Sequence, residues 1–131
     1  MTQNALIQIM VVGSGGFAGS IMRYWISGLL NRMLPLTSFP AGTFVVNIAG
    51  CFLIGLFAGI IELNGLLNPY SRLFLIVGVL GGFTTFSTLG YECYSLLNAM
   101  KIFMAFLNLG LHISFGLLAV WGGQILARLV T

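Results

Sequence analysis

Charged side chains are rare in this sequence, and the long uncharged intervals between them limit the folds it can adopt. A helix needs about 20 residues to cross a hydrocarbon layer of ~30 Å, and most of the intervals are long enough to do so. Because 59% of the 131 residues are hydrophobic and only 5% are charged, the polar side chains are too few to cover a soluble globule. The sequence therefore predicts an integral membrane protein. The charged residues are Arg23, Arg32, Glu62, Arg72, Glu92, Lys101 and Arg128.

The uncharged intervals divide the chain into four apolar stretches with turn-forming residues between them. Pro35 and Pro40 stand in the first joint, Pro69 in the second, and the short segment NAMK forms the third. The N-terminus lacks the basic region of a signal peptide, so the first stretch is expected to be retained as a span. We predict an all-α protein of the cell membrane, a single domain over residues 1–131, with helices at about 5–30, 42–61, 73–97 and 102–127.

The placement of the basic residues gives almost no preference for one orientation. In a four-span chain one face of the membrane carries Arg72 and Arg128, and the other carries Arg32 and Lys101. Basic residues near span ends normally favour the cytoplasmic side, and here the two faces balance. We therefore predict that copies insert both ways up and pair as an antiparallel homodimer. A single orientation with a weak bias is the alternative.

Small and polar residues also suggest a second copy. Helices in lipid associate through flat small-residue faces, and three pairs of glycines stand four residues apart. A single four-helix bundle would have difficulty sheltering its polar side chains from lipid, whereas a dimer offers more interior. The glycine pairs are Gly15 and Gly19, Gly55 and Gly59, and Gly78 and Gly82.

The third stretch contains the unusual segment GGFTTFSTLGYE, from Gly81 to Glu92. Adjacent Gly81 and Gly82 weaken a helix near the expected bilayer midplane, so we predict a broken third helix there. Irregular backbone at that depth is tolerated only where it is buried in protein or lines a watery cavity. Released carbonyls and neighbouring hydroxyls could then bind ions or cap a restarting helix. The alternative is a glycine-rich packing face whose hydroxyls bond back to their own helix.

Motifs for catalysis are lacking. Cys51 and Cys93 lie in different spans and form no C-x-x-C pair, and no His or carboxylate spacing indicates a metal site of side chains. The sequence contains no phosphate-binding loop after a strand and no nucleophile beside a base. We expect neither enzymatic activity nor an organic cofactor, and no nucleic-acid partner.

Three motifs, GGFAGSIMRYW, PAGTFVVNIAGCFLIG and GVLGGFTTFSTLGYE, together resemble the small fluoride channels of the Fluc (CrcB) family. The resemblance covers the whole chain, with the motifs in the family's order and spacing. It implies a dual-topology dimer of four-helix subunits that encloses two antiparallel fluoride pores. It also implies a structural Na⁺ at the two-fold axis, held by the backbone carbonyls of Gly81 and Thr84 from each subunit.

The resemblance assigns further residues to the fluoride path. The pore asparagine falls on Asn47, the hydroxyl track on Ser87 and Thr88, and the arginine at the pore mouth on Arg23. Phe86 matches a pore phenylalanine, whose positive ring edge could weakly stabilise a passing fluoride. Glu92 matches a family carboxylate, for which we expect polar bonding near the other end of the pore.

The chain departs from the family pattern in two spans. Leu89 replaces a second pore phenylalanine. In the last span, Asn108 matches a polar pore position, and Gly116 stands where a pore-facing serine is usual. His112 is expected to be a packed, hydrogen-bonded histidine rather than a proton carrier, because no carboxylate stands one turn away along the helix.

The expected function is passive, fluoride-selective export from the cytoplasm, which reduces fluoride toxicity. Two alternatives belong to other classes. A proton-coupled exporter of the small multidrug type would need a carboxylate in the first span, which has none. A non-transporting accessory subunit would use the glycine faces but would leave the hydroxyl cluster unexplained.

Overall fold

A computed structural model describes residues 3–34, 39–65 and 68–131. Every long element is helical, and four stretches are long and apolar enough to cross a membrane, as predicted: Gln3–Met33, Ala41–Leu63, Pro69–Asn98 and Ile102–Val130. The helices extend past the predicted limits by a few residues at most ends. Their bounds are α1 (Gln3–Met33), α2 (Ala41–Asn64), α3 (Pro69–Arg72), the π-helical segment η1 (Leu73–Leu80), α4 (Gly81–Phe83), α5 (Phe86–Asn98) and α6 (Ile102–Val130).

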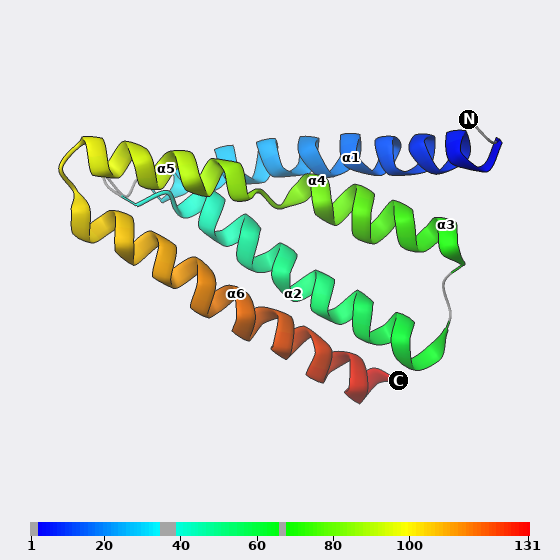
Figure 1. Ribbon diagram of the computed structural model, residues 1–131. Coiled ribbons are helices and arrows are strands. Elements are labelled where there is room, and N and C mark those ends of the chain that lie inside the picture. Colours follow the sequence, from blue (N-terminus) through cyan, green and yellow to red (C-terminus); the bar gives the residue numbers. More distant parts are fainter. Residues whose placement is uncertain (1–2, 35–38, 66–67) are drawn as a thin grey trace.

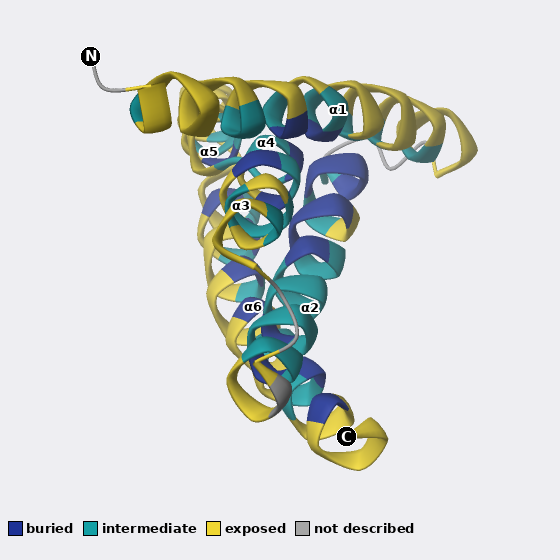
Figure 2. Ribbon diagram, turned by 90° about the vertical axis from the view of Figure 1, so that its right-hand side faces the viewer, coloured by how far each residue is buried: buried dark blue, intermediate teal, exposed yellow. Residues whose placement is uncertain are grey.

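The four spans form two layers. Helices α2 and α6 run side by side and make the most extensive contact in the molecule, while α1 packs along η1 and α4 (Figure 1). The outer side of α1 is largely exposed along its length, as the yellow ribbon in Figure 2 shows. In a bilayer such an exposed apolar helix faces lipid or another protein chain.

Glycines set the distance between the helices of this chain. A Cβ atom at Gly123 of α6 would lie 2.2 Å from the carbonyl oxygen of Phe52 on α2, and one at Gly19 of α1 would lie 2.1 Å from that of Val79. The glycine pairs that suggested a partner surface all make close approaches inside the chain. The packing of the single chain therefore accounts for these pairs without a second copy.

The third span is interrupted, but not at the predicted glycines. Gly81 keeps helical angles (φ −64°, ψ −36°), whereas Thr84 (φ −90°, ψ 156°) and Thr85 (φ −153°, ψ 121°) are extended. The prediction that Gly81 and Gly82 form the break is therefore wrong. The Thr85 hydroxyl accepts the N–H of Thr88 at 3.3 Å and so begins a new helix, α5. Capping chemistry, rather than glycine flexibility, positions the interruption.

The glycine contacts predict that adding one methyl group at Gly123 opens the α2–α6 interface. We expect Gly123→Ala to destabilise the protein by roughly 1–3 kcal/mol, since a close-packed interface must separate to admit the new atom. Thermal unfolding in detergent micelles measures this. Gly122→Ala is the matched control, because a Cβ there meets nothing within 4 Å. Equal unfolding temperatures for the two variants would contradict the proposed packing.

Candidate functional site

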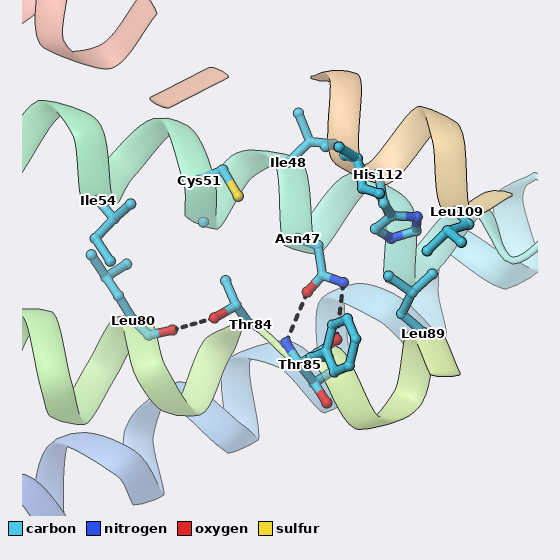
Figure 3. Close-up of a pocket in the computed structure, with 13 residues that line it drawn as sticks. Asn47, Ile48, Cys51, Ile54, Leu80, Thr84, Thr85, Leu89, Leu109 and His112 are labelled. Carbon is cyan, nitrogen blue, oxygen red and sulfur yellow. Dashed lines mark hydrogen bonds between the residues drawn. The ribbon is translucent and has the colours of Figure 1, made fainter. Parts of the chain in front are cut away.

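Asn47 joins α2 to the interruption in the third span. Its Nδ2 donates to the Thr85 carbonyl at 3.1 Å, and its Oδ1 accepts the Thr85 N–H at 2.9 Å. Figure 3 shows both bonds between the side-chain amide and the extended residue. Asn47 is buried, with only 8% of its surface exposed. The amide therefore supplies the donor and acceptor that the helix no longer provides to Thr85.

The interruption also changes the bonding of two backbone carbonyls. In a continuous helix the Gly81 carbonyl would accept the Thr85 N–H, which here goes to Asn47. The Thr84 carbonyl belongs to an extended residue just before the capping position of α5. Both carbonyls are thus released from regular helical pairing and are hard oxygen ligands of the kind that bind Na⁺ at broken helices. The predicted pair of sodium ligands therefore fits this part of the backbone.

A polar cavity of about 370 Å³ lies on one side of the Asn47–Thr85 pair. Arg23 lines it from α1 and Thr88 from α5, together with Asn47 and Thr85. The predicted pore-mouth arginine, pore asparagine and one hydroxyl of the track are thus brought together. Further polar side chains from α1 and α2 also line it: Ser20, Tyr24, Ser27, Asn31 and Thr43.

An apolar cavity of about 320 Å³ lies on the other side of the same pair, which lines both cavities. Phe86 and Leu89 line it from α5, and His112 lines it from α6. The Phe86 side chain is 80% exposed in the single chain, so its ring edge can meet a ligand or another helix. Leu89 is buried in the wall where the family pattern has a second ring. Figure 3 shows the labelled lining residues.

Two predicted path residues lie apart from these cavities. The Ser87 hydroxyl bonds with the Thr85 hydroxyl at 3.0 Å, and Ser87 lines neither cavity. Asn108 is completely buried, and its Nδ2 donates to the sulfur of Cys93 at 3.8 Å. Ser87 is exposed and Asn108 lies in the interior, and in the single chain neither lines the space beside Asn47.

The structure pairs a carboxylate with a hydroxyl that sequence reasoning did not connect. The Thr43 hydroxyl of α2 donates to Oε1 of Glu92 on α5. Thr43 lines the polar cavity beside Arg23, so Glu92 is linked to that cavity through one hydrogen bond. Separation by 49 positions left no local pattern that could reveal the pair. The signal available in the sequence was a polar residue in each of two apolar spans.

Taken together, the fold and the site define a multi-pass membrane protein with two cavities that meet at a polar bridge in an interrupted helix. The chain belongs to the CrcB family: residues 10–124 match the model described as "CrcB-like protein, Camphor Resistance (CrcB)". It is 44% identical to a protein of Flavobacterium psychrophilum over 92% of this chain and 96% of that protein. It is 40% identical to a protein of Clostridium novyi over 95% of this chain and 97% of that protein. Both relatives are named "Fluoride-specific ion channel FluC".

The Asn47 bridge predicts a large cost for its removal. In Asn47→Leu the N–H and carbonyl of Thr85 lose their partners in a buried site, and each orphaned group costs about 1–3 kcal/mol. We expect a clear drop in the thermal unfolding temperature in micelles. Asn98→Leu, at the exposed end of α5, is the control for loss of an asparagine. An Asn47→Leu protein as stable as this control would show that the bridge contributes little.

Proposed function

We propose that this protein is a channel through which fluoride leaves the cytoplasm passively. The observation that carries the proposal is the Asn47–Thr85 bridge, which forms a wall shared by a polar and an apolar cavity. The names of the relatives, which cover nearly the whole chain, support fluoride as the ion. Channels require no catalytic group, and the function proposed here is not enzymatic.

The residues of the polar cavity suit the entry of a small anion. Arg23 supplies a fixed positive charge that raises the local anion concentration. The Thr88 hydroxyl, with its neighbours, replaces water around the ion. Asn47 then releases the Thr85 carbonyl and donates its Nδ2 hydrogen to the fluoride. The Asn47–Thr85 bridge thus closes the wall between the two cavities when no ion is present. When an ion passes, Asn47 supplies the hydrogen-bond donor.

The apolar cavity suits a weakly bound ion that moves on quickly. An aromatic ring carries partial positive charge at its edge, so a fluoride passing the rim of Phe86 is stabilised weakly. Weak, sequential binding is what rapid conduction requires. Hydrogen fluoride enters a cell as the neutral acid and ionises inside, and a negative-inside potential drives the trapped anion outward. This scheme needs no nucleotide and no gradient of a second ion to drive export.

The assembly that completes the path is an antiparallel homodimer with Na⁺ at its centre. Balanced basic residues on the two membrane faces support insertion in both orientations. The interruption falls halfway along the Pro69–Asn98 span, so it lies near the bilayer midplane in either orientation. There the Gly81 and Thr84 carbonyls of two copies surround the cation, which has a structural role and leaves the fluoride path free. The largely exposed α1 and the exposed Phe86 ring leave surface for the second copy.

Reconstituted protein is expected to carry fluoride. Liposomes that contain the protein, are loaded with potassium fluoride and carry a potassium ionophore should release fluoride, measured by an external fluoride electrode. The release should be much faster than from protein-free liposomes loaded in the same way. With chloride in place of fluoride, release should stay near the empty-liposome rate. Folded protein that releases fluoride no faster than empty liposomes would contradict the proposed function.

If fluoride passes through the polar cavity, its flux should depend on the Thr88 hydroxyl. Thr88→Val keeps the shape of the side chain but removes one hydroxyl, which contributes about 0.5–1.5 kcal/mol as a hydrogen bond, so flux should fall roughly 2- to 10-fold. Ser14→Ala removes an exposed hydroxyl of α1 and is the matched control. Equal loss in both variants would place the path elsewhere.

The sodium proposal predicts that dimer stability depends on the cation. In sodium-containing buffer, short cross-linkers should trap a dimer in lipid. Exchange of sodium for N-methylglucamine should lower both the cross-linked fraction and the fluoride flux, since four carbonyls would then face one another without a charge between them. Addition of sodium should restore both. A dimer of equal yield in both buffers would argue against a cation at Gly81 and Thr84.

A further inference from the structure

His112 carries a buried polar atom that has no partner among the described residues. Its ring lines the apolar cavity, and only 8% of the residue surface is exposed. The Nε2 atom makes no hydrogen bond, whereas Nδ1 lies 3.0 Å from the Asn108 carbonyl oxygen. The expectation of a packed, hydrogen-bonded histidine is thus confirmed for one ring nitrogen only.

The side-chain amide and the hydroxyl groups of this cavity are already engaged. Both ends of the Asn47 amide bond Thr85, and the Thr84 hydroxyl donates to the Leu80 carbonyl at 3.0 Å. The Thr85 hydroxyl bonds Ser87 and Thr88. Nε2 of His112 is therefore a buried nitrogen without a partner among the described residues that line this cavity, where the Cys51 thiol is also free. Figure 3 shows the His112 ring extending from α6 toward Leu89 and Leu109.

The bond at Nδ1 determines what Nε2 can bind. A backbone carbonyl only accepts hydrogen bonds, so Nδ1 must carry the proton. In the neutral ring Nε2 is then a bare acceptor, which would repel an anion. In the imidazolium form the same atom becomes a charged N–H donor. An anion in the apolar cavity can therefore use His112 only after the ring gains a proton.

We propose that protonated His112 is a fluoride ligand and that fluoride and a proton occupy this cavity together. The proposal rests on the fluoride conduction proposed above and adds a subsite to it. The proton comes from hydronium or from hydrogen fluoride. In the second case the H–F bond breaks, the new N–H bond forms at Nε2, and the electron pair stays on fluoride. The resulting imidazolium and fluoride pair is neutral overall, which reduces the cost of placing either charge in an apolar site.

The surrounding groups are compatible with an imidazolium. On α2 the ring meets Phe44 edge to face, at a centroid distance of 5.1 Å, and the titratable neighbour on the same cavity wall is the Cys51 thiol. On α5 the titratable groups nearby are Glu92 and Cys93, which interact with the Asn108 side chain one turn before His112. The fixed cation Arg23 lies on the other cavity, beyond the Asn47–Thr85 bridge.

Gly116 leaves the helix surface next to His112 without a hydroxyl. It lies one turn after His112 on the buried side of α6, and a Cβ there would lie 3.5 Å from the Cys51 sulfur at the cavity wall. A serine would fit at that position, but glycine supplies no hydroxyl. His112 is the polar side chain that remains on this side of the helix beside the cavity.

The first arm of the test measures fluoride flux against pH. Flux is compared at about pH 7.5 and about pH 5.5, because acid increases the protonated fraction of a histidine ring. At a clamped potential, and after subtraction of the leak through empty liposomes, wild-type flux should rise several-fold over this range. His112→Gln keeps a polar side chain that does not titrate, and its flux should not vary with pH. Ser114→Ala, exposed on the same helix, should keep the wild-type pH profile.

The second arm uses the fact that His112 is the only histidine in the chain. Nitrogen-15 labelling of histidine gives one pair of ring signals, whose shifts report the fraction of imidazolium. At neutral pH, added fluoride should increase that fraction, because bound fluoride strengthens proton binding as much as the bound proton strengthens fluoride binding. Added chloride at the same concentration should leave it unchanged. This measurement uses wild-type protein and stands even if His112→Gln fails to fold.

The outcomes separate the two proposals. Fluoride flux with no dependence on pH, or ring signals that respond equally to fluoride and chloride, would overturn the His112 subsite and leave the channel in place. Absence of flux at every pH, in protein whose ring signals respond selectively to fluoride, would overturn the channel but support the binding site.

Discussion

The two hydrogen bonds between Asn47 and Thr85 are the constraint on which the rest of the structure depends. A helix that stops inside a bilayer leaves backbone groups that no water can satisfy. A side-chain amide carries a donor and an acceptor, as a peptide group does, so one asparagine on α2 can replace both lost partners of Thr85. The interruption is stable because α2 is held beside it. The same bridge separates the two cavities, so the stability of the fold and the candidate path depend on one contact.

Much of the fold follows from hydropathy and charge spacing. Four spans were predictable because the cost of burying charge in hydrocarbon leaves few alternatives for a chain with so few charged residues. The position of the interruption was not predictable from glycine content. Gly81 and Gly82 lower helix propensity by only about 1 kcal/mol each, and neighbouring turns and tertiary contacts outweigh that preference. Gly82 is needed instead for close contact, since a Cβ there would lie 2.6 Å from the Gly16 carbonyl oxygen.

The candidate site was predictable in its components but only partly in its arrangement. Motif positions identified Arg23, Asn47 and Thr88, and the fold brings these residues to one cavity. The link between Thr43 and Glu92 depends on how α2 packs against α5, which no local spacing encodes. The state of His112 was likewise hidden, because it depends on a carbonyl of its own helix and on the absence of a partner for the other nitrogen.

The distribution of charge along the two cavities explains how such a site could bind fluoride without holding it. Fluoride is strongly hydrated, and neutral donors such as Thr88 and Asn47 can replace part of its water shell without creating a deep electrostatic trap. The fixed charge of Arg23 stands in the polar cavity, where water can screen it. In the apolar cavity a permanent cation would bind too tightly, whereas an imidazolium at His112 loses its charge when the proton leaves. A removable charge placed after a fixed one therefore allows capture in the first cavity and release from the second.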